Sequence, residues 1–211
     1  GQDNVINTIL SGYQLDTAIL QEGNRNQVLK KSQGITGDYN QVVVEQWNNT
    51  NSTDINKIWI DIDGDSNAVD VGQGCKFLYS NSTSCDRDTH EDAGHEMEIN
   101  ITGDYNWVRG GQKSGTADPD HTLVMDINSD NNSVWFTQAG SGDKNLDLTI
   151  NNDGNSVSIH QHYGAHTATV TLDGTSPTDL NLIQTGGPSQ TYNLMQNCLT
   201  IGGCSVSVTQ Q

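Results

Sequence analysis

Four cysteines are the residues of this chain with the clearest chemistry. They form two local pairs, Cys75 with Cys85 and Cys198 with Cys204. An even number of cysteines in local pairs is typical of disulfides formed in an oxidising compartment. Zinc is the alternative, but neither pair has the usual gap of about two to four residues between zinc ligands. The spacing therefore favours two disulfides and an extracellular protein, and leaves open whether the bonds form within or between chains.

Histidines and carboxylates gather at two places. They are His90, Glu91, Asp92, His95 and Glu96 in the first, and His160, His162 and His166 in the second. Imidazole and carboxylate groups suit zinc or copper. The five-residue step from His90 to His95 does not match the two-histidine helix motif of zinc proteases. We interpret both groups as solvated polar segments and predict no metal site.

Catalytic and cofactor-binding motifs are not found in the sequence. It has no Gly-x-Ser-x-Gly elbow, no phosphate-binding Walker loop and no pair of carboxylates that could be assigned to acid and base roles. Asp61, Asp63 and Asp65 alternate beside a glycine turn, but no EF-hand spacing follows them. We therefore predict that the protein is not an enzyme and has no cofactor, with weak calcium binding as the most that these aspartates support.

Composition excludes several classes of protein. Only 32% of the 211 residues are hydrophobic, and the mean hydropathy is −0.60, which is too polar for a layered domain around a large aliphatic core. Three prolines and an even spread of β-branched residues argue against disorder. The net charge of −17 disfavours nucleic-acid binding, and no apolar run approaches the roughly 18 residues of a membrane helix. We expect no nucleic-acid partner and no membrane insertion.

An internal repeat is the strongest pattern. In the segment Ile58–Gln73, IWIDIDGDSNAVDVGQ, apolar and polar residues alternate on both sides of a turn at Gly64, which indicates two short strands. Four anchor positions, such as Asn56, Ile62, Asn67 and Gln73, are separated by six, five and six residues. Eight units start near residues 4, 26, 56, 95, 121, 144, 166 and 190; five keep this spacing, and those at 26, 166 and 190 fit it with a slip. They predict one domain over residues 1–211 with an insertion loop at about 74–94.

A unit of two strands and two turns can close into one flattened rung. Rungs stacked about 4.8 Å apart pair each strand with the rungs above and below. We therefore predict an all-β fold, a β-solenoid of about eight two-strand rungs with inserted loops. Its thin interior would need only small and medium apolar residues, such as Val69, Val157 and Ile159.

Asparagine and glutamine recur at the strand ends of the predicted rungs. Stacking would place each amide beside its counterpart one rung away, which satisfies both groups. The predicted amide ladder consists of Asn67, Gln73, Asn106, Gln112, Asn132, Gln138, Asn155, Gln161, Gln184 and Gln210. The alternative, ordinary surface amides, would not keep this register over eight units.

These motifs resemble a known repeat. The pattern Gln-x-Gly-x-x-Asn at Gln21–Asn26 resembles the curlin repeat of curli fibre subunits, as do GDYNQVVVEQ at Gly37–Gln46 and GDYNWVRGGQ at Gly103–Gln112. The resemblance implies a secreted protein that polymerises into functional amyloid of the biofilm matrix, with secretion and nucleation partners. The chain departs from the pattern at positions such as Ile62 and Ile101, where curlins carry glutamine.

Assembly follows from the expected open ends. The first anchor, Asn4, and the last, Gln210, leave no obvious capping segment in this sequence. Unpaired strand edges would dock last rung to first, and such a contact does not close but forms a filament. We expect a head-to-tail homopolymer in a cell-surface fibre. The alternative is a monomeric or anchored β-solenoid adhesin that binds partners through its inserted loops.

Overall fold

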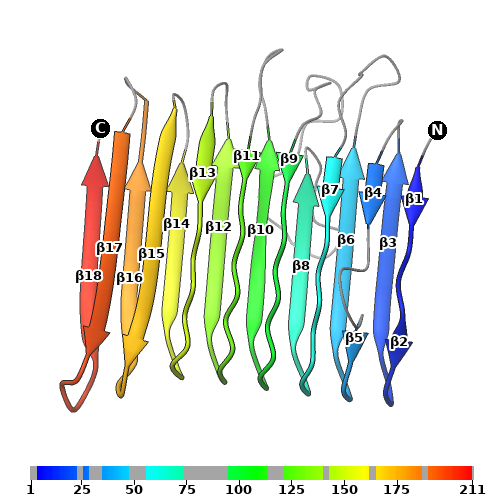
Figure 1. Ribbon diagram of the computed structural model, residues 1–211, viewed down its shortest axis with the longest axis horizontal. Coiled ribbons are helices and arrows are strands. Elements are labelled where there is room, and N and C mark those ends of the chain that lie inside the picture. The colour runs from blue at the N-terminus through cyan, green and yellow to red at the C-terminus, as the bar shows by residue number, and fades with distance from the viewer. Residues whose placement is uncertain are drawn as a thin grey trace, which may run out of the picture.

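A computed structural model gives the fold. It describes residues 4–22, 26–28, 35–47, 56–73, 95–113, 121–139, 143–161, 165–186 and 190–210. Every regular element in these ranges is a β-strand, and every paired strand is parallel to its neighbour. No helix among the described residues could cross a membrane. Figure 1 shows the strands stacked from the N-terminus at one end to the C-terminus at the other. The predicted all-β solenoid is confirmed.

One wall of the solenoid is a continuous eight-stranded sheet with one strand from each predicted unit. Its strands are, in order, β3 (Asp16–Glu22), β6 (Gln41–Trp47), β8 (Ala68–Gln73), β10 (Trp107–Lys113), β12 (Ser133–Ala139), β14 (Ser156–Gln161), β16 (Thr178–Gln184) and β18 (Cys204–Gln210). All seven pairings keep one register, so residues at equivalent positions of the repeat form columns that run along the stack.

The second wall is divided into three smaller sheets. They consist of β1 (Val5–Ile6), β4 (Asn26–Val28) and β7 (Asn56–Ile58); β2 (Leu10–Ser11) and β5 (Ile35–Thr36); and β9 (His95–Glu96), β11 (His121–Thr122), β13 (Lys144–Leu146), β15 (His166–Gly174) and β17 (Gln190–Cys198). The first two units each contribute two short strands to this wall, and the later ones a single strand. Regular turns therefore number about six, slightly fewer than the eight predicted units.

Positive backbone angles shorten the strands of this second wall. Ile99, Ile101 and Asp126 have φ of 92°, 104° and 112°, in a region that residues other than glycine rarely adopt. The alternation of apolar and polar residues predicted regular strands here. Ile99 and Ile101 do point inward and are fully buried, as alternation predicts. The side-chain pattern is thus kept while the backbone ladder is interrupted.

Apolar side chains from both walls fill the space between them as one continuous cluster. The eight-stranded sheet, here called the long wall, contributes columns that include Val69, Val157 and Ile159. The second wall contributes a column that ends each half-unit, and its fully buried members are Ile62, Ile101, Ile127, Ile150 and Leu172. Because the same position recurs in each rung, a modest number of medium-sized residues closes the whole interior.

One core position departs from this uniformity. Gly110 on β10 pairs with Phe136 on β12, in a column otherwise occupied by aliphatic residues such as Val71 and Ile159. A Cβ atom on Gly110 would overlap the ring of Phe136, which is fully buried. The missing side chain in one rung therefore makes room for the largest core side chain in the next.

Replacing Gly110 with alanine should destabilise the solenoid. The new methyl group would collide with a ring that close packing prevents from moving, and overpacking of this kind costs about 2 kcal/mol. Thermal denaturation followed by circular dichroism measures the effect. Gly111→Ala is the matched control, since Gly111 lies on the outer face of the same strand opposite Thr137. Equal melting temperatures for the two variants would contradict this account of the core.

Candidate functional site: side-chain ladders and end rungs

A buried asparagine ladder runs through five consecutive rungs at the turn that precedes the long wall. Its members are Asn40, Asn67, Asn106, Asn132 and Asn155, each about 1% exposed. The Oδ1 atom of each of the first four accepts two hydrogen bonds from the next asparagine, one from the backbone N–H and one from Nδ2. The Nδ2 distances are 3.2, 3.1, 3.1 and 2.9 Å along the stack. Four of these five residues were predicted, and Asn40 extends the ladder by one rung.

The ladder is satisfied at its sides and has defined ends. Each Nδ2 also donates to the turn of the same or the next rung, as in the 2.7 Å bonds from Asn67 to the Gly103 carbonyl and from Asn106 to the Ser129 carbonyl. The Thr178 N–H donates to Asn155 Oδ1 at 2.8 Å and ends the series. At the other end of the ladder, the residue of the first rung equivalent to Asn40 is Leu15, because the next residues, Asp16 and Gln41, pair with each other. The buried asparagine side chains of the ladder are thereby paired with other protein groups.

The glutamine column differs from the single ladder that was predicted. Gln112 donates to Gln138 at 2.7 Å, whereas in the C-terminal rungs Gln184 donates back to Gln161 at 2.8 Å. Gln210 likewise donates to Gln184 at 3.2 Å. Gln138 donates instead to the backbone carbonyl of Lys144 on the second wall, at 2.6 Å.

These cross-wall bonds explain the change of direction. Gln161 donates to the Asn145 carbonyl at 3.3 Å, so Gln138 and Gln161 both use their amide hydrogens to join the two walls. The column therefore consists of separate stacks that also hold the walls together. The side chain of Gln73, another predicted member, lies outside the described residues.

Replacing Asn132 with alanine should cost about 3 kcal/mol of unfolding free energy. The change removes the acceptor of the Asn155 N–H at 2.8 Å and leaves buried donors unpaired. Urea denaturation measures the loss. Asn181→Ala is the control, because Asn181 is an exposed asparagine on β16 and surface substitutions change stability by about 0.5 kcal/mol or less. Similar losses for both variants would refute the importance of the ladder.

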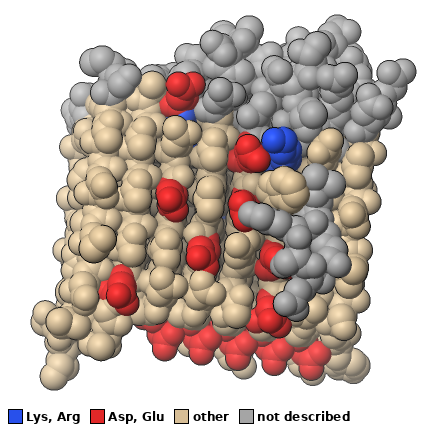
Figure 2. Space-filling view, viewed as in Figure 1, with Lys and Arg blue, Asp and Glu red and all other residues tan. Residues whose placement is uncertain are grey.

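A second ladder, of aspartates, follows the turns and was not predicted. Its members are Asp38, Asp65, Asp104, Asp130 and Asp153. Each Oδ1 accepts the backbone N–H of the equivalent residue one rung earlier, over 2.7 to 3.0 Å. Figure 2 shows a row of acidic side chains along the edge where these turns lie. The repeated turn aspartate was visible in the sequence, but nothing there indicated that its carboxylate pairs between rungs.

The aspartate row fixes the turns at an electrostatic cost. Neighbouring carboxylates are about one rung, or about 4.8 Å, apart, and like charges at this spacing repel unless salt screens them. Of the three aspartates noted in the sequence, Asp65 belongs to this row and Asp63 accepts a 2.9 Å bond from the Thr36 hydroxyl. Within the described ranges, no three His, Cys, Asp or Glu side chains are placed to hold a metal ion.

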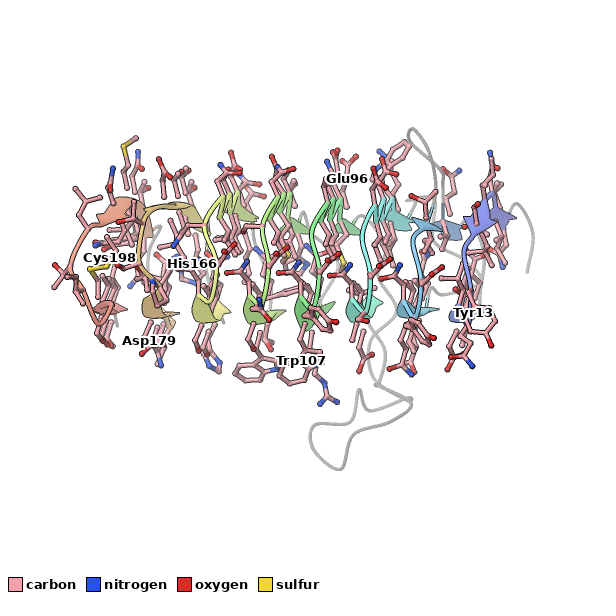
Figure 3. All side chains as sticks on the ribbon, turned by 90° about the horizontal axis from the view of Figure 1, so that it is seen from below. Tyr13, Glu96, Trp107, His166, Asp179 and Cys198 are labelled. Carbon is pink, nitrogen blue, oxygen red and sulfur yellow. A yellow bond between two sulfur atoms is a disulfide. The ribbon has the colours of Figure 1, made fainter. Side chains whose placement is uncertain are left out.

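A column of basic side chains is buried at the start of β11, β13 and β15. His121, Lys144 and His166 stack in register and are at most 1% exposed. Figure 3 shows His166 between the two walls. Burial lowers the pKa of Lys144 to about 8, an effect that the neighbouring Asp143 carboxylate opposes. The stack thus contains an ammonium group whose charge is held at a cost.

The other histidines of the two sequence clusters do not form a site among the described side chains. His160 lies on the outer face, where its ring makes an edge contact with Trp135 at 4.6 Å between centroids. His90, Glu91, Asp92 and His162 lie outside the described residues, as does the side chain of His95. Glu96 forms an ion pair with Lys57 at 3.4 Å.

Replacing Lys144 with methionine should change how stability depends on pH. Between about pH 8 and about 10.5 the unfolded chain keeps a proton on this lysine that the folded chain has lost, so folding becomes more favourable as pH rises. Methionine removes this pH dependence, and it also removes the cost of burying a charged ammonium group below about pH 8. We expect the variant to be more stable than the parent at pH 7, with an advantage that shrinks above pH 8. Denaturation midpoints at pH 7, 8, 9 and 10 would test this, and a constant difference would contradict it.

The last turn is closed by a disulfide. Cys198 and Cys204 are bonded, with 5.9 Å between their Cα atoms, which confirms this predicted pair. The loop they enclose joins β17 to β18 in the final rung. Cys75 and Cys85 lie outside the described residues, so their pairing stays a prediction.

The two end rungs expose most of the large apolar side chains that reach the surface. Eleven such residues are exposed among those described. Five belong to the first rung and three to the last: Val5, Ile6, Ile9, Leu10 and Tyr13, and Met195, Leu199 and Ile201. Figure 3 shows Tyr13 at one end of the stack and Cys198 at the other. The apolar surface is therefore concentrated where the stack begins and ends.

Comparison with known proteins adds no relative to this description. No known protein family matches the chain, and neither a curated protein nor a solved structure matches it. The architecture alone places it in a class: its strands are parallel, stacked in register and wrapped around one core. The chain is a parallel β-solenoid with buried amide ladders, an aspartate row and apolar end rungs.

Proposed function

We propose that this chain is a structural subunit that self-assembles head-to-tail into an extracellular, curli-like cross-β fibre of the cell surface or biofilm matrix. The observation that carries the proposal is the concentration of exposed apolar side chains on the first and last described rungs. The same two rungs hold the outer strands of both walls, β3 and β1 at one end and β18 and β17 at the other.

Both end rungs gain from a partner. None of the described residues pairs with the outer edges of β3 and β18, and unpaired strand edges are templates for further strands. Leu15 and Ile19 in the first rung and Val206 and Val208 in the last are only partly buried, whereas the central columns are closed. A docked rung would bury this apolar surface, at about 25 cal/mol for each Å² removed from water.

The register of the stack predicts how two copies meet. Continuing the columns places Gln21 of one copy on Gln210 of the other, since both end the same column of the long wall. Gln21 has an Nε2 group that donates to the exposed Val5 carbonyl at 3.2 Å and could instead donate to the neighbouring copy. A contact between two different ends of the same chain does not close on itself, so it produces a filament.

Two further features support an extracellular fibre. The repeat motifs resemble those of curli subunits, whose partners include secretion and nucleation proteins, and the Cys198–Cys204 disulfide suits an oxidising compartment. The proposal assigns the chain no catalytic role and no cofactor. It includes no nucleic-acid partner and no insertion into a membrane.

Purified protein should form long, uniform filaments whose fibre diffraction has a meridional spacing near 4.8 Å. Electron microscopy with and without calcium shows whether assembly occurs and whether cations that screen the net charge of −17 speed it. Persistent monomers at high concentration would refute the fibre and favour a monomeric or anchored adhesin that binds through its inserted loops.

A pair of variants locates the junction. Val208→Asp places a charge on the inward face of the last rung and should stop filament growth while circular dichroism stays that of the parent. Ser207→Asp is the matched control, because Ser207 is the neighbouring outward residue on β18. Growth by the Val208 variant at the parental rate would place the junction elsewhere.

A further inference from the structure

One outer column of the second wall is polar in its middle rungs and apolar at its ends. Thr149 is bridged to Thr171, which pairs with Met195 in the last rung. Asp126, one unit before Thr149, is also polar. The equivalent residue of the first rung is Ile9, whose carbonyl accepts the Ile35 N–H at 2.9 Å. Ile9 is 45% and Met195 81% exposed, so apolar side chains stand at both ends of a hydrophilic column.

The turns show the same distribution. The last turn is longer than those before it and carries Leu199 and Ile201, which are 68% and 100% exposed. A Cβ atom on Gly202 would meet nothing within 4 Å, so the loop has open space around it. In Figure 1 this loop extends sideways from the C-terminal end of the stack. The first turn, at the opposite end, carries Tyr13, which is 61% exposed.

We propose that these residues form a clamp between two copies of the chain, an inference that rests on the proposed head-to-tail assembly. Met195 of one copy packs on Ile9 of the next. The disulfide-closed loop 199–203 of the first copy closes over Tyr13 of the second. The clamp acts outside the backbone ladder and selects which ends meet and in which register.

The register of the stack supports this pairing. Gly174 pairs with Cys198, and Thr178 pairs with Cys204, so the last turn starts and ends in the same columns as the turns before it. A further rung in this register would place its turn, and therefore Tyr13 of the next copy, beside the enlarged loop. The same continuation places Ile9 directly on Met195, in the column of Thr171.

Charge explains why the clamp is apolar. Each copy has a net charge of −17, so two copies repel as they approach. The loop Leu199–Gly203 and the residues Ile9 and Tyr13 carry no charge. Contacts between them contribute attraction that does not depend on ion pairs. Docking removes from water the apolar surface that these residues expose in the free chain, which is favourable.

The disulfide gives the loop a defined shape before docking. Within the loop the Gly203 N–H donates to the Thr200 carbonyl at 3.0 Å, and the Cys204 N–H donates to the Pro177 carbonyl at 3.0 Å. The covalent bond between Cys198 and Cys204 restricts the remaining freedom. A restricted loop loses less conformational entropy on binding, which strengthens the contact.

Seeded elongation of the full chain tests the clamp. The double variant Leu199→Ser, Ile201→Ser should still form filaments with the spacing of the parent, but its elongation rate should fall about tenfold, the effect of losing roughly one buried apolar contact. Tyr105→Ser is the control, since Tyr105 is an exposed apolar side chain in a middle turn, at 63% against 68% for Leu199. Its elongation rate should equal that of the parent.

Cross-linking tests the register independently. The variant Ile9→Cys, Met195→Cys should give an intermolecular disulfide between these positions under oxidation, identified by peptide mass spectrometry. Ile9→Cys, Thr171→Cys, one rung further back, should not. Filaments that elongate normally without Leu199 and Ile201, or that cross-link equally at Thr171, would overturn the clamp and leave the fibre standing. Absence of filaments from the parent chain would overturn both.

Discussion

Parallel pairing of each rung with the equivalent rung before it is the constraint on which the rest of the structure depends. Once strands such as β10 and β12 pair without a shift, each side chain meets its counterpart at about 4.8 Å. An asparagine then finds a donor on one side and an acceptor on the other, and an apolar residue finds an apolar neighbour. A carboxylate also meets a carboxylate, which is why the aspartate row combines backbone bonds with repulsion.

This constraint explains how so polar a chain keeps a closed interior. Amide pairs such as Asn106 with Asn132 occupy places that would otherwise need apolar residues, and stacking supplies their partners without water. The same rule exacts a cost where the repeated position carries charge. Lys144 lies in register between His121 and His166, and its buried side chain has a lowered pKa.

The sequence predicted whatever depends on position within the repeat, such as the strands of the long wall and the ladder residues Asn67 and Asn106. It could not predict features that depend on which of two neighbours a side chain chooses. Gln112 and Gln138 have equivalent positions, yet Gln112 donates to the next glutamine and Gln138 to a second-wall carbonyl, which alternation does not encode. The turn aspartates were missed because aspartate before or after glycine is common in any turn. Positive φ at Ile99 contradicts the local preference of a β-branched residue, and alternation alone does not predict it.

The connection between β8 and β10 shows how little the stack depends on chain length. Asn67 and Asn106 bond as neighbours although 39 residues separate them, whereas 23 residues separate Asn132 from Asn155. The pairing geometry is the same in both cases, so the segment between two rungs is free to vary in size and content. Such a junction would tolerate an inserted peptide or a whole domain, and the proposed filament would then display that cargo at regular intervals along its length.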